Sequence, residues 1–179
     1  MEARRSLNVL VTGGSGFVGM AVIEELIRRG HRVIATTRTL SETLPVDQNL
    51  SWTSWDAMHE ALPQVDWKDI HAILHLAAPT TRFTFPEEAP CMYEVAIAAT
   101  FRFLEAARKN GVQRVLVAST GDVLGSNERP ACEDDLLYMP SSFYGTAKAC
   151  AELLLRSYQS ILSTAILRFY HPFGPRGDR

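Results

Sequence analysis

The sequence has few of the features that mark nucleic-acid-binding, metal-binding or disulfide-stabilised proteins. It has only three cysteines in 179 residues, and its 18 basic residues are balanced by 20 acidic ones. Cys91, Cys132 and Cys150 are widely spaced and odd in number, which fits neither a disulfide framework nor a zinc site, so we interpret them as reduced thiols. A formal net charge of −2 offers no basic surface for nucleic acid. We therefore predict no metal site and no nucleic-acid partner.

Long hydrophobic runs are also missing. The first apolar stretch, Leu7–Val11, is five residues long and leads directly into a glycine-rich turn, so it is too short for a membrane span or a signal peptide. We expect no membrane partner and a cytoplasmic location. A composition of 46% hydrophobic and 21% charged residues is typical of a soluble globular domain, and one domain with a full core is expected.

The sequence does contain a glycine-rich turn between that apolar run and a helical pattern, Met20–Arg29. In such a strand–turn–helix unit, Gly13 or Gly14 would form the tight turn, Gly16 would let the backbone approach a pyrophosphate, and Gly19 would let the helix pack on the sheet. Backbone N–H groups at the start of the helix would then face an anion. An ordinary glycine turn is the alternative, but the flanking strand and helix favour a dinucleotide site.

Strand-like runs alternate with helical patterns along the rest of the chain. Two amphipathic stretches, Tyr93–Asn110 and Ser142–Ser160, are predicted helices, and Gly111 ends the first of them. Further strands are expected at His31–Thr37, Asn49–Ser54, Asp69–Ala78, Gln113–Ser119 and Ser163–Phe169. Apolar strands between helices indicate a parallel sheet covered on both faces. We predict an α/β fold with a Rossmann-type doubly wound sheet of order 3-2-1-4-5-6, whose ligand crevice lies at the carboxyl ends of the strands.

Several short motifs follow one another along the chain. They are TGGSGFVG at 12–19, HLAA at 75–78, LEAA at 104–107, AST at 118–120 with VLG at 123–125, YGTAK at 144–148 and LRFYHPFGP at 167–175. In this order they resemble the extended branch of the short-chain dehydrogenase/reductase superfamily, the NAD-dependent epimerase/dehydratase family of nucleotide-sugar enzymes. The resemblance covers nearly every residue. It implies hydride transfer between NAD or NADP and a hydroxyl or keto group of a small-molecule substrate, a nucleotide sugar.

A tyrosine and a lysine in the YGTAK motif are candidate catalysts. Tyr144 and Lys148 are four residues apart on a predicted helix, so their side chains share one face. An ammonium near a phenol favours the phenolate and lowers the pKa of the tyrosine toward the range of a general base. The resemblance implies the same roles, with Lys148 also holding the nicotinamide ribose. A surface aromatic and a solvated lysine are the alternative interpretation.

A hydroxyl at the end of the fifth predicted strand is the third candidate catalyst. The resemblance assigns the bond to the reacting oxygen to Thr120, which stands three residues before Val123, and Ser119 competes for that role. For both residues, a hydroxyl that caps a strand end is the structural alternative. Dehydratases of the family place acids beside the catalytic Thr, whereas this chain has a single acid, Asp122, two positions on, so dehydratase chemistry is less favoured.

The choice of cofactor depends on the end of the second strand, where an Asp or Glu would bind the ribose of NAD. Here no acid is present, and Arg38 can pair with a 2′-phosphate, so NADP is favoured and NAD beside a solvated Arg38 is the alternative. Asp56 matches the family's Asp that contacts adenine, with a helix N-cap as its alternative. The predicted cofactor-binding residues are Gly13, Gly14, Ser15, Gly16, Phe17, Val18, Gly19, Arg38, Asp56, Ala57, Leu76, Ala77, Ala78, Ser119, Tyr144, Lys148, Tyr170, Pro172 and Phe173.

The chain departs from the family pattern in three places. Ala96 and His171 stand where the family usually has Asn, and the substrate lobe that the resemblance implies after the sixth strand is largely absent. We therefore expect residues 1–179 to be the cofactor-binding Rossmann domain of a longer enzyme, with a short protein that keeps only this half as the alternative. A non-catalytic NADP-binding sensor or regulatory module is the alternative function. His75, inside a strand, is interpreted as a packed, hydrogen-bonded histidine rather than an acid or metal ligand.

Many members of the family dimerise through the two long helices. The resemblance therefore implies a homodimer in which apolar residues such as Phe101, Leu153 and Leu154 meet a second copy. Core packing is the commoner use of apolar residues at such helical positions and is the alternative.

Overall fold

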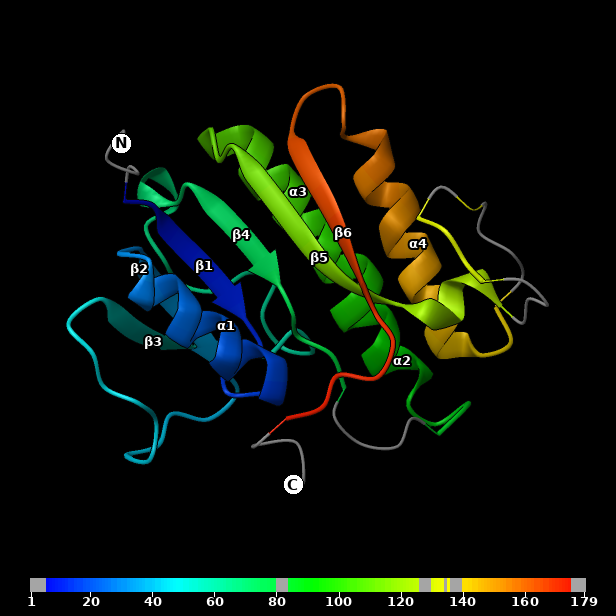
Figure 1. The fold of residues 1–179 in the computed structure, drawn as a ribbon, viewed down its shortest axis with the longest axis horizontal. Helices are drawn as coiled ribbons and strands as arrows, with labels where there is room; N and C mark the ends of the chain where they lie inside the picture. Colours follow the sequence, from blue (N-terminus) through cyan, green and yellow to red (C-terminus); the bar gives the residue numbers. More distant parts are fainter. Residues whose placement is uncertain (1–5, 80–83, 126–129, 134, 136–139, 175–179) are drawn as a thin grey trace.

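Six parallel strands form one sheet of order β3-β2-β1-β4-β5-β6 in the computed structural model, which describes residues 6–79, 84–125, 130–133, 135 and 140–174. This order confirms the predicted Rossmann-type topology (Figure 1). The strands are β1 (Asn8–Thr12), β2 (Arg32–Thr37), β3 (Leu50–Ser54), β4 (Ala72–His75), β5 (Arg114–Thr120) and β6 (Ser163–Phe169). Because the strands are parallel, all their carboxyl ends meet at one edge, where the predicted site residues gather.

The helices lie on opposite faces of this sheet. Helix α1 (Phe17–Arg28) covers one face beside β1 and β2, whereas α3 (Ala99–Asn110) and α4 (Phe143–Ser157) cover the other face beside β4, β5 and β6 (Figure 1). Each helix connects two parallel strands, and a right-handed connection places it on the side observed. Short helical segments complete the described chain: η1 (Trp67–Asp69), α2 (Ala89–Met92), η2 (Tyr93–Ala98) and η3 (Gly121–Leu124).

Two apolar clusters hold the layers together. The larger one surrounds Phe103 of α3, which is fully buried and packs with Ile73 and Val115 of the sheet. The smaller one joins Ile23 of α1 to Val9 and Val33 on the other face. Side chains of successive strand residues point to opposite faces, so the nearly continuous apolar strands supply both clusters.

Four predicted elements differ from the structure at their ends. Strand β4 is shorter than expected because residues 67–69 form a 3₁₀ turn, in which the N–H of Lys68 donates to the side chain of Asp66. Helix α1 begins three residues earlier than predicted, immediately after the glycine turn. The long helix after β4 begins at Ala89 and contains a π-helical segment, η2, that the amphipathic pattern did not indicate. Helix α4 begins after its N-cap Ser142, whose hydroxyl accepts from the Gly145 N–H.

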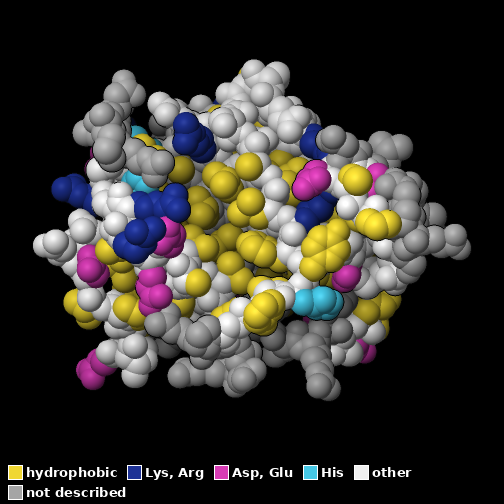
Figure 2. Space-filling model, viewed as in Figure 1, with side chains coloured by type: hydrophobic (Ala, Val, Ile, Leu, Met, Phe, Trp, Pro, Cys, Tyr) yellow, Lys and Arg dark blue, Asp and Glu magenta, His cyan; other side chains and the backbone are white. Residues whose placement is uncertain are grey.

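The face of the sheet that carries α1 is only partly covered. Leu116 and Leu167 are half-buried and Ala165 is exposed on neighbouring strands β5 and β6. Figure 2 shows hydrophobic side chains gathered over the middle of this face. Within the described residues, no helix is long and apolar enough to cross a membrane.

Candidate functional site

The glycine-rich turn after β1 is built by close backbone contacts. Gly13 has a φ of +69°, and a Cβ at this position would lie 2.8 Å from backbone atoms of Ala77, so Gly13 rather than Gly14 makes the tight turn. Gly14 packs beside Trp52 instead. A Cβ at Gly19 would overlap the carbonyl oxygen of Gly13. Helix α1 therefore approaches the turn that directly follows β1 most closely at Gly19.

The N-terminus of α1 lacks the usual side-chain cap. Its N-cap residue is Gly16, none of the described side chains accepts a hydrogen bond from the first turn, and the first turn contains no acidic residue. The first N–H groups of a helix have no partner inside the helix, and the helix dipole makes this end positive. An anion beside Gly16 would find both the donors and the field that stabilise it.

This helix end opens into a cavity of about 380 Å³ at the carboxyl edge of the sheet. Most of the predicted cofactor-binding residues line it: Gly13, Ser15, Gly16, Phe17, Val18, Gly19, Arg38, Asp56, Ala57, Leu76, Ala77 and Ala78. The cavity wall also includes residues that the sequence did not indicate: Thr36, Thr37, Trp55, Met58, Pro79, Cys91 and Val95. Thr36 and Thr37 directly precede Arg38, so their position at the end of β2 could have indicated them. Cys91 and Val95 belong to a helix that is far away in the sequence, and no local pattern indicated them.

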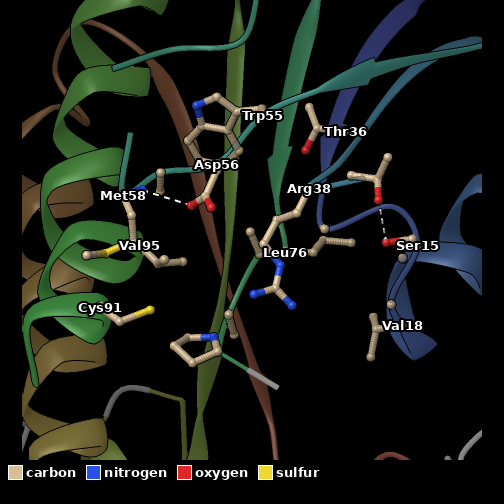
Figure 3. A pocket seen from close by; sticks show the side chains of 18 of the residues that line it. Ser15, Val18, Thr36, Arg38, Trp55, Asp56, Met58, Leu76, Cys91 and Val95 are labelled. Carbon is tan, nitrogen blue, oxygen red and sulfur yellow. Dashed lines mark hydrogen bonds between the residues drawn. The ribbon is translucent and has the colours of Figure 1, made fainter. Parts of the chain in front are cut away.

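Polar groups are placed on two sides of this cavity. The exposed Arg38 projects its guanidinium into it, between Val18 and Cys91 (Figure 3). The hydroxyls of Ser15 and Thr37 are 3.1 Å apart and join the glycine turn to the end of β2. The carboxylate of Asp56 accepts from the N–H of Met58 at 3.0 Å and so caps a turn, not the helix that was the alternative. The cavity wall therefore carries both a cation, Arg38, and an acid, Asp56.

The predicted catalytic residues lie outside this cavity, at the ends of β5 and the start of α4. The ammonium of Lys148 is buried and donates to the carbonyl of Ala118 at 2.8 Å. Burial without a charged partner disfavours its protonated form and lowers the pKa of Lys148 to about 8. Gly145, next to Tyr144, packs on the backbone of Asp122, so the start of α4 abuts the segment that follows Thr120.

The expected effect of Lys148 on Tyr144 is wrong for the structure as it stands. The pKa of Tyr144 is raised, first by burial of the phenol and second by the negative charge of Asp122. The Lys148 ammonium lies 5.9 Å from the centre of the tyrosine ring and is directed to a backbone carbonyl. Shared placement on one helix face was predicted correctly, but the lysine does not lower the pKa of the phenol. Burial and the charge of Asp122 therefore favour the protonated phenol of Tyr144.

Ser119 and Thr120 are separated by the geometry of β5. The Ser119 hydroxyl is buried and donates to the carboxylate of Glu152 on α4 at 2.5 Å. Arg168 of β6 binds the same carboxylate through two nitrogens, at 2.7 and 3.0 Å. The hydroxyl of Ser119 therefore faces α4 and not the cavity. Thr120 accepts from the N–H of Asp122 at 3.3 Å and is the remaining candidate for the reacting oxygen.

The two residues that stand where the family usually has Asn, Ala96 and His171, have different surroundings. Ala96 is buried in η2 against Met92 and Ala147, with Tyr144 packed beside this cluster, so an apolar contact stands where the family carries Asn. His171 is exposed in the segment after β6.

The segment after β6 carries the last three predicted cofactor residues. Tyr170 packs over Gly121 and is 60% exposed, and Phe173 is 95% exposed. Pro172 is also exposed, and none of the three lines the cavity. The last residue of the LRFYHPFGP motif, Pro175, and the terminal residues 176–179 lie outside the described residues.

The interpretation of His75 as a packed histidine is confirmed. Its ring is 1% exposed and lies between Trp55 and Phe103. Its two nitrogens are hydrogen-bonded to Thr12 and to the carbonyl of Val95. Burial lowers the pKa of His75 to about 4, so the ring is neutral at physiological pH.

A doubly wound sheet, a glycine turn that leads into an uncapped helix, and a Tyr-x-x-x-Lys pair beside a strand-end Thr together define a Rossmann-type protein of the short-chain dehydrogenase/reductase class. The model of the NAD dependent epimerase/dehydratase family matches residues 9–179. The chain therefore belongs to the NAD dependent epimerase/dehydratase family.

Named relatives agree with this assignment. A UDP-N-acetyl-alpha-D-glucosaminuronate decarboxylase of Bacillus cytotoxicus is 32% identical, over 93% of this chain and 55% of its own length. A dTDP-4-dehydro-6-deoxyglucose reductase of Escherichia coli is 30% identical, over 97% of this chain and 58% of its own. The solved structure of MoeE5 in complex with UDP-glucuronic acid and NAD superposes with a TM-score of 0.81 at 33% identity, over 96% of this chain and 58% of that chain. The chain thus spans a little over half the length of these relatives.

Proposed function

We propose that this chain is the cofactor-binding half of an oxidoreductase that prefers NADP and transfers hydride to or from a hydroxyl or keto carbon of a nucleotide sugar. The observation that carries the proposal is one cavity in which the uncapped N-terminus of α1, the glycine turn and the guanidinium of Arg38 face the same space. MoeE5, which was solved with NAD and UDP-glucuronic acid, supports a nicotinamide dinucleotide and a nucleotide sugar, whereas the preference for NADP is argued from Arg38.

The residues present fit a dinucleotide. The crowded contacts of Gly13 and Gly19 keep side chains out of the turn, which leaves the start of α1 open to a pyrophosphate. Asp56 and Trp55 lie on the wall toward Met58, where an adenine would be placed. Arg38 supplies the positive charge that a 2′-phosphate requires, and the strand end carries no acid that would repel it.

The chemistry that we propose uses three side chains beside this cavity. A bound nicotinamide would supply or accept the hydride. Tyr144, held protonated by burial and by Asp122, would give a proton to a carbonyl oxygen as it is reduced, or recover one in the opposite direction. Thr120 would orient that oxygen by a hydrogen bond. Lys148, through its bond to the carbonyl of Ala118, fixes α4 on the end of β5 and so positions Tyr144.

Replacing Arg38 with Ala should weaken NADPH binding by about 10- to 100-fold and leave NADH binding nearly unchanged, because only NADPH carries the phosphate that the guanidinium would pair with. The measurement is a titration of the purified chain with each reduced nucleotide, followed by nicotinamide fluorescence. Wild-type protein should bind NADPH more tightly than NADH.

Arg32→Ala is the matched control, because Arg32 is an exposed arginine at the opposite end of the same strand, β2. It should alter neither affinity. Equal loss of NADPH and NADH binding in Arg38→Ala would contradict the preference for NADP, and the absence of binding by the wild-type chain would overturn the proposed function.

We also propose that two copies of the chain pair through the long helices. Phe101 of α3 is 48% exposed and Leu153 of α4 is 57% exposed, and these helices pack side by side. Leu154, by contrast, packs against the core cluster and is not available for a partner. Large apolar side chains on adjacent helices are costly to leave in water, and a second copy would cover them.

The double variant Phe101→Glu with Leu153→Glu should therefore be monomeric in sedimentation equilibrium, while the wild-type chain is dimeric. Val46→Glu is the control for an exposed apolar residue elsewhere, since Val46 is 97% exposed in the loop between β2 and β3, and it should remain dimeric. A wild-type chain that sediments as a monomer would refute the pairing.

A further inference from the structure

A chain of hydrogen bonds runs through the protein behind the cavity. The Thr12 hydroxyl at the end of β1 is 2.7 Å from Nδ1 of His75 on β4, and Nε2 of the same ring is 2.8 Å from the carbonyl oxygen of Val95 in η2. The N–H of Ala77 donates to the Thr12 hydroxyl oxygen at 3.2 Å. Three segments that are far apart in sequence are therefore connected through two side chains.

The direction of every bond in this chain is determined. A backbone carbonyl only accepts, so Nε2 of His75 must carry the proton and donate to Val95. In the neutral ring Nδ1 is then an acceptor, so the Thr12 hydroxyl donates to it. The Thr12 hydroxyl oxygen accepts from the N–H of Ala77, so each donor and each acceptor in this chain has one hydrogen-bond partner. Burial keeps the ring neutral, because a second ring proton would leave the Thr12 hydroxyl proton without an acceptor.

The bonded groups belong to the wall of the cavity. Ala77 and Val95 both line it, and Cys91, which lies one helical turn before Val95, lines it as well. The Val95 carbonyl lies inside the π-helical segment, where the widened turn displaces carbonyls from regular α-helical pairing. Among the described residues, His75 is the side chain that is hydrogen-bonded to this carbonyl.

From this geometry we infer that Thr12 and His75 are positioning residues of the cofactor cavity, which hold the π-helical wall and the Ala77 backbone at a fixed separation. The inference rests on the proposed function, in that the cavity is the site of the dinucleotide. Without these side-chain bonds, η2 loses its hydrogen bond to β4 and Ala77 loses its bond to Thr12, so the wall is freer to shift at the place where the nucleotide would bind.

Thr12→Val tests this inference, because valine has nearly the shape of threonine but neither donates to His75 nor accepts from Ala77. It should weaken binding of NADPH and of NADH alike by about 10-fold or more. Thr12→Ser, which keeps the hydroxyl, should restore the affinity. In wild-type protein, nitrogen NMR of the His75 ring should show the proton on Nε2 at neutral pH.

Thr100→Val is the matched control. Thr100 is fully buried and its hydroxyl donates to the carbonyl of Ala96, so this variant also loses a buried bond to a carbonyl of η2 but makes no change at the cavity wall. It should lose stability in urea without losing affinity for the nucleotides. This contrast separates positioning of the cavity from a general loss of stability.

The possible outcomes test the positioning role of Thr12 and His75 separately from the proposed function. If wild-type protein binds a nucleotide and Thr12→Val binds it equally well, or if the His75 proton lies on Nδ1, the inference is wrong and the proposed function stands. If Thr100→Val weakens binding as much as Thr12→Val, the effect is only structural and the inference is wrong. If wild-type protein binds neither nucleotide, the proposed function fails and the inference fails with it.

Discussion

Replacing Tyr144 with Phe should slow hydride transfer by about 10²- to 10⁴-fold, which is the usual contribution of a general acid or base, while lowering the affinity for NADPH by a much smaller factor. The phenol is the proton donor of the proposed reaction, and its raised pKa keeps it protonated at neutral pH. The measurement is the absorbance of reduced nicotinamide after the chain and the oxidised cofactor are mixed with a panel of UDP-sugars, or its loss in the reverse direction.

Tyr158→Phe is the control for this change. Tyr158 follows the same helix, α4, and its hydroxyl donates to Glu105 far from the cavity, so the variant loses a hydrogen bond but should keep the wild-type rate. An unchanged rate in Tyr144→Phe would remove Tyr144 from the mechanism. If wild-type protein binds NADPH but no sugar of the panel is oxidised or reduced, the alternative of a non-catalytic binding module is favoured.

Replacing Glu152 with Ala should lower the free energy of unfolding by about 3–5 kcal/mol, because it removes one partner of a buried ion pair. The Glu152 side chain is 1% exposed and that of Arg168 is 11% exposed. The variant would leave the guanidinium without its carboxylate and the Ser119 hydroxyl without its acceptor. Urea denaturation followed by circular dichroism measures the change.

Glu25→Ala is the matched control for this prediction. Glu25 also pairs with arginines, Arg28 and Arg29, but on the solvent-exposed side of α1. Exposed ion pairs contribute little, because water screens them, so this variant should unfold at nearly the wild-type urea concentration. A midpoint for Glu152→Ala that matches that of Glu25→Ala would show that the buried pair does not join α4 to β5 and β6 as we describe.

Much of the cavity could be predicted from the sequence because its residues are local. The glycine turn, the start of α1 and the end of β2 are short segments whose roles follow from backbone geometry, and the residues from Ser15 to Gly19 line the cavity as predicted. Arg38 follows from its position immediately after a strand. The wall formed by Cys91 and Val95 could not be predicted, since it depends on a helix that begins 11 residues after Ala78 and on a π-helical segment with no pattern in the side chains.

The protonation of the catalytic residues also could not be predicted. Spacing on a helix places Tyr144 and Lys148 on one face, but it does not say whether the ammonium points to the phenol or to a carbonyl. The fold buries Lys148, partly buries Tyr144 and brings Asp122 from η3 close to the phenol, and these surroundings raise the pKa of Tyr144. A pKa depends on burial and on charges from other elements, so only the packed structure decides it.

The sequence by itself determined the alternation of strands and helices, the order of the sheet and the glycine turn, because these follow from the periodicity of apolar residues and from the steric demands of short turns. Tertiary structure decided which hydroxyl at the end of β5 faces the site. Ser119 and Thr120 point to opposite faces of one strand, and the position of Glu152 on α4 assigns Ser119 to the helix side. It also decided the chain of bonds through His75, because three distant segments must pack together before those groups can meet.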